Sequence, residues 1–313
     1  MRLVFLGSPP FATPVLARVL ESRHVVAAVV TRPDRPSGRG LKVDVSPLAL
    51  LARARSVAVL QPASARDPAF VQAVRALEPE VLLVASYGEI LGRDLLEVAP
   101  RGALNVHASI LPRHRGASPI QAAILAGDAE TGVSIQRMVL ALDEGDVLLE
   151  KRTPIGPREN ASELLDRLSA LGAEGAVAAL DLLEAGKATF TPQDPTRATY
   201  ARRIQKEQGR IDWTKSSAEL VRHVRAMTPW PGARATAPGG KEIVLLDAEA
   251  AEIPRSPTPT EPGTILGSER GLLVATGDGA LAVFGVKPAG GVRMHGAAWL
   301  RGARLQPGAR FLP

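Results

Sequence analysis

The chain has 313 residues, 45% of them hydrophobic, and a formal net charge of +6 at pH 7. This length and hydrophobic content suit a globular protein of two domains. The absence of cysteine excludes disulfides, thiolate metal sites and a cysteine nucleophile. No uninterrupted apolar run approaches the ~18 residues that a membrane-spanning helix needs, and the basic balance favours a polyanionic ligand such as nucleic acid.

The N-terminal half alternates short apolar runs with helical patterns. The first run, 3–6, is too short for the core of a signal peptide, so we expect a first strand and a cytoplasmic protein. Further apolar runs occur at 25–30, 57–60, 81–85 and 103–106, and helical patterns occur near 13–21, 46–55, 67–78, 92–98 and 161–185. Runs that are apolar on both faces suit parallel strands covered by helices. The pattern therefore predicts an α/β fold with a doubly wound, mostly parallel sheet.

The C-terminal part differs from the N-terminal part in composition and in hydrophobic pattern. Residues 186–213 are rich in proline and polar residues, which is typical of a linker. A helical stretch at 216–227 precedes short strand-like pieces at 232–237, 242–250, 263–268, 271–279 and 280–290. These predict a small β-barrel of the OB-like kind. We therefore expect a catalytic domain over 1–189, a linker over 190–206 and a C-terminal β-barrel domain over 207–313.

Asn105 and His107 end the last apolar run of the first domain, in the stretch LNVHASILPRHRG. Residues two apart on a strand project from the same face, and ligand sites of open parallel sheets lie beyond the carboxyl ends of the strands. An Asn amide can donate to a developing oxyanion, and a His accepts a proton near neutral pH. The pair is therefore a candidate catalytic site, although a lone histidine on a strand is more often structural.

Three carboxylates, Asp143, Glu144 and Asp146, surround Gly145 in the stretch ALDEGDVLLE. Three interpretations stay open: a cation site, a carboxylate that orients the histidine, or an ordinary Asp-Gly turn. Because no further metal-ligand spacing accompanies them, we expect no metal.

Two loops follow the first two predicted strands. The stretch GSPPF at 7–11 opens a helix and either binds a phosphate or forms a plain tight turn, but it lacks the G-x-G-x-x-G fingerprint of nicotinamide cofactor sites. The second loop, TRPDRPSGRGLKV at 31–43, is long and basic. Its cationic residues are Arg32, Arg35, Arg39 and Lys42. Arginine suits phosphate, and the alternative is a solvated surface loop.

Taken together, LNVHASILPRHRG and the downstream LDEGD resemble the 10-formyltetrahydrofolate-dependent formyltransferase superfamily, whose members share an N-x-H strand, an S-L-L-P loop and a downstream Asp. The stretches GSPPFATPVL, TRPDRPSGRG, AGDAETGVSIQ, QGRIDW and TPWPGA are similar to the methionyl-tRNA formyltransferase branch of that superfamily. This similarity extends over nearly the whole chain. The basic loop distinguishes this branch from its relatives.

The resemblance implies an enzyme of translation initiation. It would transfer the formyl group of 10-formyltetrahydrofolate, a co-substrate, to the α-amino group of methionine on initiator tRNA. Asn105 would stabilise the tetrahedral oxyanion, His107 would take part in proton transfer from the amine, and Asp143 would pair with His107. No metal is implied, and we expect a monomer that does not enter a membrane.

The resemblance also implies contacts with the two substrates. The folate cleft would be formed by Ser109, Ile110, Leu111, Pro112 and by Ser86, Tyr87, Gly88, Glu89, Ile90, Leu91, the last six through their backbone. The tRNA would be held by Arg35, Arg39 and Lys42 of the basic loop and by the C-terminal barrel. Three departures from the family pattern are His114 in place of a common Trp, Ile110 in place of Leu, and Ala49 where a Lys often follows the basic loop.

Three other functions remain alternatives at this stage. Formyl transfer to an amino sugar nucleotide uses a similar N-terminal domain, but the basic loop and the pI of about 10.0 argue against it. A non-catalytic RNA-binding protein is disfavoured by the intact set of Asn, His and Asp. A nicotinamide dehydrogenase is disfavoured by the absent glycine fingerprint.

Overall fold

The computed structural model describes all residues except 38–41, 254–259, 270 and 313, and gives only the backbone of 35–37 and 42–44. The chain forms two compact units. The first consists of Met1–Pro119, Glu130–Pro154 and Leu165–Arg202, and the second of Ile120–Ala129, Ile155–Leu164 and Arg203–Pro313.

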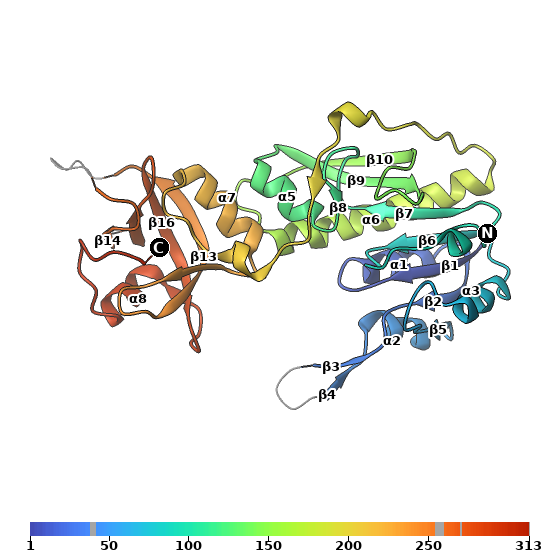
Figure 1. Ribbon diagram of the computed structural model, residues 1–313, viewed down its shortest axis with the longest axis horizontal. Helices are drawn as coiled ribbons and strands as arrows, with labels where there is room; N and C mark the ends of the chain where they lie inside the picture. Colours follow the sequence, from blue (N-terminus) through green and yellow to red (C-terminus); the bar gives the residue numbers. More distant parts are fainter. Residues whose placement is uncertain (38–41, 254–259, 270, 313) are drawn as a thin grey trace. The chain divides into compact units, whose positions relative to one another are not determined.

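The first unit is built on a seven-stranded sheet in the order β10-β9-β7-β6-β1-β2-β5 (Figure 1). Its strands are β1 (Arg2–Gly7), β2 (Val25–Val30), β5 (Ala58–Leu60), β6 (Val81–Ala85), β7 (Ala103–His107), β9 (Glu130–Arg137) and β10 (Val147–Pro154). The five strands from β5 to β7 are parallel, and β9 and β10 are antiparallel to their neighbours. The predicted α/β fold with a doubly wound, mostly parallel sheet is confirmed.

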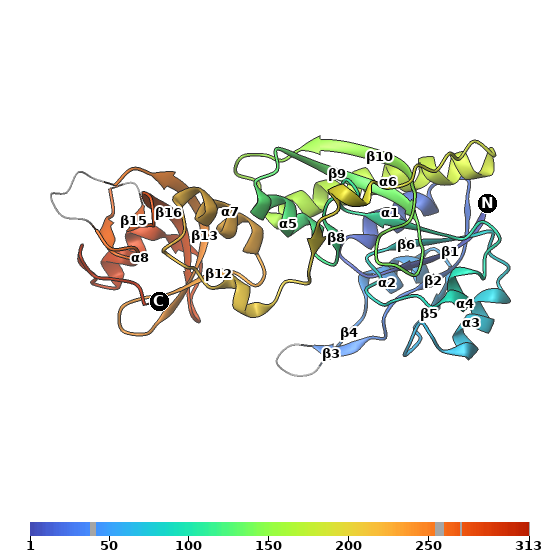
Figure 2. The same ribbon diagram turned by 45° about the horizontal axis from the view of Figure 1, so that its top comes forward.

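Helices cover both faces of this sheet (Figure 2). They are α1 (Ala12–Leu20), α2 (Pro47–Ala54), α3 (Pro68–Arg75), α4 (Arg93–Leu96) and α6 (Ala161–Glu184). The strand order runs outward from β1 through β2 to β5 and then returns to β6 and β7, so right-handed crossovers place α1 and α2 on one face and α3 and α4 on the other. The sheet therefore reverses its winding between β1 and β6, where doubly wound folds hold their ligands.

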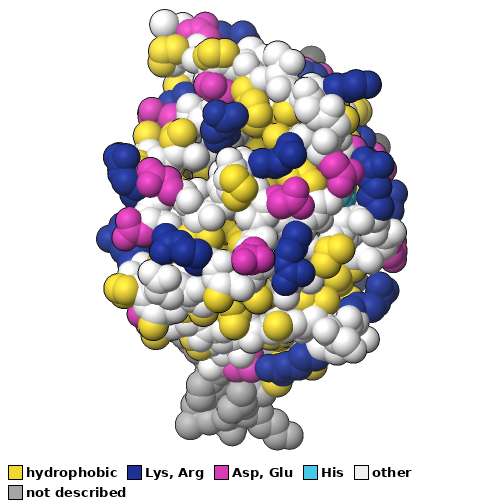
Figure 3. Space-filling model, turned by 90° about the vertical axis from the view of Figure 1, so that its right-hand side faces the viewer, with side chains coloured by type: hydrophobic (Ala, Val, Ile, Leu, Met, Phe, Trp, Pro, Cys, Tyr) yellow, Lys and Arg dark blue, Asp and Glu magenta, His cyan; other side chains and the backbone are white. Residues whose placement is uncertain are grey.

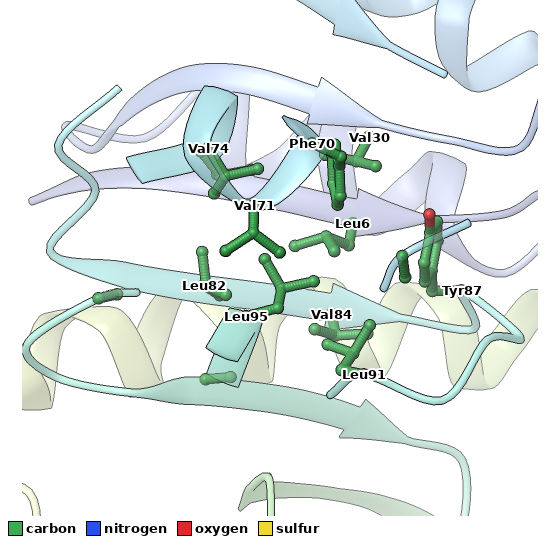
Figure 4. Packing of buried hydrophobic residues seen from close by; sticks show 14 of the residues in the cluster. Leu6, Val30, Phe70, Val71, Val74, Leu82, Val84, Tyr87, Leu91 and Leu95 are labelled. Atoms are coloured by element: carbon green, nitrogen blue, oxygen red, sulfur yellow. The ribbon is translucent and has the colours of Figure 1, made fainter. Parts of the chain in front are cut away.

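A buried apolar cluster fixes the loop that follows β6 (Figure 4). Phe70 and Val71 of α3 and Leu95 of α4 pack on the sheet, and each such side chain contributes roughly 1.5–3 kcal/mol when fully buried. Tyr87 and Leu91 lie in the same cluster although they belong to the loop. The loop backbone between them is therefore anchored by side chains that point into the core.

The second unit contains a curled antiparallel sheet. Its strands are β12 (Ala233–Thr236), β13 (Glu242–Ala251), β14 (Ile265–Gly267), β15 (Leu272–Ala275), β16 (Ala280–Pro288) and β17 (Met294–His295), in the order β12-β13-β16-β15-β14 with β17 beside β16. The C-terminal segment bridges the two edge strands, because Phe311 N donates to Gly263 O at 2.9 Å and Leu312 N donates to Thr236 O at 2.9 Å. This closure gives the barrel-like domain that the sequence predicts.

The helices of the second unit are α5 (Pro119–Ala126), α7 (Ser217–Met227) and α8 (Gly296–Gly302). Ser216 and Glu219 form a capping box at the start of α7, which satisfies two otherwise unpaired N–H groups. Trp213 and Trp299 pack beside Phe311 with ring centroids 5.2 and 6.2 Å away, so aromatic contacts hold the closing segment. In the part of the chain that the structure describes, no helix is both long and apolar enough to span a membrane.

Candidate active site

Asn105 and His107 lie at the carboxyl end of β7, between parallel β6 and antiparallel β9. Residues alternate along the strand, so both side chains leave the sheet on the same face. On the other face of β7, Val106 packs against α6. The contact is close, because a Cβ added to Gly172 of α6 would lie 2.9 Å from Val106 Cγ1. His107 is only 5% exposed, so its ring is surrounded by protein atoms and has little contact with solvent.

Asp143 belongs to the turn between β9 and β10 and has a φ of 53°. This left-handed conformation is uncommon for residues other than glycine, although Asp tolerates it better than most. Its Oδ1 accepts hydrogen bonds from Gln136 Nε2 at 2.8 Å and from Asn105 Nδ2 at 3.3 Å. Its Oδ2 accepts one from the backbone N–H of Gly116 at 2.8 Å. The carboxylate is therefore fixed by donors from three separate segments.

The hydrogen bonds of His107 define which ring nitrogen can accept a proton. Nε2 lies 3.0 Å from His114 O, and a carbonyl only accepts, so Nε2 carries the hydrogen. In the neutral ring Nδ1 is then the acceptor, and it lies 3.7 Å from Asp143 Oδ1. A proton taken up at Nδ1 would therefore lie on the side of the ring that faces the Asp143 carboxylate.

The loop after β7 contains the predicted folate residues Ser109, Ile110, Leu111 and Pro112. Ser109 is completely buried, and its Oγ donates to Arg113 O at 2.6 Å. Ser134 of β9 braces the same loop, because its Oγ donates to Ser109 O at 2.8 Å and accepts from Leu111 N at 3.0 Å. The side chain of Ser109 therefore shapes the loop from within, and the loop lies beside the Asn–His pair.

The predicted folate segment after β6 is Ser86, Tyr87, Gly88, Glu89, Ile90, Leu91. Hydrogen bonds tie it to the other loops at this edge: Ser8 Oγ donates to Tyr87 O at 3.1 Å, and Arg32 Nη2 donates to Gly88 O at 2.7 Å. Burial raises the pKa of Tyr87 to about 12, so this phenol stays protonated at neutral pH and is no acid–base group. Ile90, by contrast, is 67% exposed and is free to meet a ligand.

Two of the predicted tRNA-binding residues, Arg35 and Lys42, lie on a small hairpin. Arg35 is in β3 (Arg35–Ser37) and Lys42 in β4 (Lys42–Asp44), which pair in antiparallel fashion, whereas Arg39 lies outside the described residues. On the face of the protein shown in Figure 3, cationic and anionic side chains are interspersed. The net positive charge is thus not gathered on that face.

The structure adds residues that sequence reasoning missed. Gln136 is 1% exposed and faces Asp143, and a buried polar residue inside a strand is a signal that could have found it. Gln193 donates to the backbone of the Asp143 turn, and no pattern in its proline-rich surroundings indicates this. Among the residues that the structure describes, no group of three or more His, Asp and Glu side chains could hold a metal ion.

The arrangement combines an imidazole that can accept a proton, a carboxylate fixed beside it, and an amide donor. An amide nitrogen has two hydrogens, and within the described residues Asn105 engages one of them, with Asp143. The other can be offered to a ligand oxygen. Such a set supports proton transfer next to an oxygen that becomes negatively charged, as in acyl transfer.

Comparisons with known proteins agree with this chemistry. Residues 1–180 match the family "Formyl transferase", and residues 203–304 match "Formyl transferase, C-terminal domain". A methionyl-tRNA formyltransferase of Symbiobacterium thermophilum is 42% identical over 315 residues, covering 100% of this chain and 96% of the relative. One of Anaeromyxobacter dehalogenans is 46% identical over 282 residues, covering 90% and 89%.

Solved structures show the same fold at low identity. An N-formyltransferase from Helicobacter canadensis, in complex with folinic acid and dTDP-3-aminofucose, superimposes with a TM-score of 0.65 at 16% identity, covering 90% of this chain and 98% of its own. HypX from Aquifex aeolicus in complex with tetrahydrofolic acid gives a TM-score of 0.64 at 19% identity. The match covers 96% of this chain but only 47% of HypX.

Proposed function

The chain belongs to the formyl transferase family, and we propose that it transfers a formyl group from 10-formyltetrahydrofolate to the α-amino group of methionine on initiator tRNA. Full-length relatives of this activity support the substrate pair. The single structural observation that carries the proposal is the convergence of Asn105, His107 and Asp143 at the carboxyl edge of the sheet.

The proposed reaction moves a formyl carbon from the N10 atom of the folate to the methionine nitrogen. The amine attacks the formyl carbon, and the carbonyl oxygen becomes an oxyanion that Asn105 Nδ2 stabilises by hydrogen bonding. His107 Nδ1 takes the proton that the amine loses on attack, and Asp143 stabilises the resulting imidazolium. The bond between the formyl carbon and N10 then breaks, and His107 returns the proton to N10.

The two substrates would meet at this edge from different sides. We propose that the loops 86–91 and 109–112 form the folate cleft, with the anchored backbone of 86–91 facing the pterin. Arg35, Arg39 and Lys42 would contact the tRNA backbone as positive charges. We further propose 1–189 as the catalytic domain, 190–206 as a linker, 207–313 as a second tRNA-binding domain, and a cytoplasmic monomer that does not enter a membrane.

The test is formylation of charged initiator tRNA with 10-formyltetrahydrofolate as donor, run beside an amino sugar nucleotide as acceptor. We expect turnover with the tRNA. Formylation of the sugar nucleotide alone would contradict the proposal and favour a sugar N-formyltransferase.

Two variants test the assigned residues in the same assay. Asn105→Ala should lower kcat by about 10²–10³, the usual loss for one oxyanion donor, and His107→Ala should lower it at least as much. Asn160→Ala is the matched control, because Asn160 Oδ1 accepts from Ser162 N at 2.9 Å at a helix start. This control should cost about 1 kcal/mol of stability and leave kcat unchanged. Wild-type turnover in Asn105→Ala would remove that residue from the mechanism.

A further inference from the structure

The segment between α6 and β11 (Tyr200–Ala201) is hydrogen-bonded to the loops of the candidate site. Val147 and Thr191 form an isolated antiparallel bridge, and β11 pairs in parallel with β8 (Arg115–Gly116). Thr199 contributes two further contacts, since His114 N donates to its Oγ1 at 2.8 Å and Arg115 N donates to its O at 2.8 Å. The segment is thus bonded along its length to the loops that carry the site.

Gln193 lies in this segment and holds the Asp143 turn by its backbone. Its Nε2 donates to Asp143 O at 2.8 Å and to Gly145 O at 2.7 Å. A third and longer contact joins Nε2 to Gln136 Oε1 at 3.3 Å, so the two hydrogens of the amide are directed mainly at the turn. The left-handed φ of Asp143 is a conformation that persists only when its surroundings hold it, and these two bonds span it.

Arg115 fixes the orientation of the Gln193 amide. Its Nε and Nη2 donate to Gln193 Oε1 at 3.1 and 2.9 Å, and its Nη1 lies 3.1 Å from Glu144 Oε1. A guanidinium only donates and a carbonyl only accepts, so one orientation of the amide satisfies both sides. Arg115 is 4% exposed, and a buried cation needs such partners.

We propose that Gln193 is a positioning residue that sets the place of the Asp143 carboxylate, and through it of His107, by fixing the 143–145 turn. This inference rests on the proposed formyl transfer. Gln193 touches neither reacting group in this role. Its loss should therefore lower the rate of the chemical step without weakening the binding of either substrate.

The first test compares two substitutions at one position. Gln193→Met keeps the length of the side chain but removes every hydrogen bond, and Gln193→Glu keeps an acceptor for Arg115 but loses the donor. We expect both to lower kcat by about 10- to 100-fold, the range for small displacements of a catalytic group and for lost orienting partners, with unchanged KM for folate and tRNA. Wild-type kcat in either variant, or a rise in KM alone, would overturn the proposal.

A matched control separates positioning from general loss of structure. Gln205→Met changes the same residue type in the same connecting region. Within the described part of the chain, Gln205 bonds to its near neighbours Arg203 and Gln208. This substitution should leave kcat unchanged. If Gln193→Met does not fold, Gln193→Glu carries the test, since it retains the pairing with buried Arg115.

The second test places Gln193→Met in an Asp143→Asn background. If Gln193 acts through the carboxylate, its substitution should add little to the loss already caused by Asp143→Asn. A full additional loss in the double variant would overturn this inference while leaving the proposed function intact. Wild-type kcat in Asp143→Asn alone would instead overturn the role of Asp143, and this inference with it.

Discussion

Replacing Gly145 by Ala should displace the turn that holds Asp143. A Cβ at this position would lie 1.7 Å from Arg137 O and 2.8 Å from Arg137 C. Both are backbone atoms of β9, where Arg137 N also donates to Asp146 O at 2.9 Å, so a side-chain rotation cannot relieve the clash. Because Cβ atoms do not approach such atoms below 3.0 Å, the turn must move by at least about 1.3 Å.

A displacement of this size has a calculable consequence for catalysis. Misplacing a catalytic group by ~1 Å can cost about 10²-fold in rate, so we expect kcat of Gly145→Ala to fall by about that factor. Overpacking should also cost about 1–3 kcal/mol of stability. The assay is steady-state formylation of charged initiator tRNA, with thermal unfolding measured on the same sample to show that the variant is folded.

Gly302→Ala provides the control for this prediction. Beyond its chain neighbours and its own helix backbone, no atom of the described residues lies within 4 Å of the added Cβ, so kcat should equal that of the wild type. A folded Gly145→Ala variant with wild-type kcat would refute the reasoning, because it would show that the position of the Asp143 turn does not matter to the reaction.

Three further predictions concern the tRNA, metals and pH. Arg39→Ala should raise the KM for tRNA and make tRNA binding depend less steeply on salt, with the KM for folate unchanged. If the KM for tRNA is the same in the variant and the wild type, the basic loop does not bind tRNA through Arg39. Treating the enzyme with a chelator should leave turnover unaffected once the magnesium needed by the tRNA is restored, whereas recovery with one particular other divalent ion would contradict this. Burial lowers the pKa of His223 in α7, so His223 binds a proton more readily in the unfolded chain than in the folded one. The buried neutral ring therefore contributes to the free energy of unfolding above the unfolded pKa of about 6.5, and this contribution is lost as the pH falls below that value. His223→Gln should therefore lose less thermal stability than the wild type between about pH 7 and pH 5, and parallel losses would show that His223 is not the responsible group.

The sequence predicts those parts of the fold that follow a simple period. The five parallel strands are short apolar runs, and their observed bounds lie within one or two residues of the predicted ones. The helix predicted at 161–185 is α6, Ala161–Glu184. Short elements with weak sequence patterns, such as α5, α8 and β17, are not predicted from the sequence, because their conformation depends more on tertiary contacts than on their own propensity.

The candidate site is predictable only in part. The spacing of Asn105 and His107 is local, so the strand period alone places them on one face. The choice of Asp143 among three carboxylates needs the family resemblance, because nothing local distinguishes it from Glu144. In the structure Asp143 lies 3.7 Å from His107, whereas Glu144 lies 3.1 Å from Arg115. That division depends on how the 143–145 turn is closed by distant residues.

Strand β9 explains why the rest of the site is hidden from the sequence. Thr131, Ser134 and Gln136 are 4%, 0% and 1% exposed, so the apolar run by which a buried strand is recognised is interrupted by polar residues. Burying a polar group is costly unless it is hydrogen-bonded, and Ser134 bonds to the loop after β7 while Gln136 bonds to Asp143. The polar residues of β9 that support the site therefore also interrupt the apolar pattern from which the strand could have been predicted. A strand whose pattern fails beside a candidate site is accordingly a place to look for residues that hold that site.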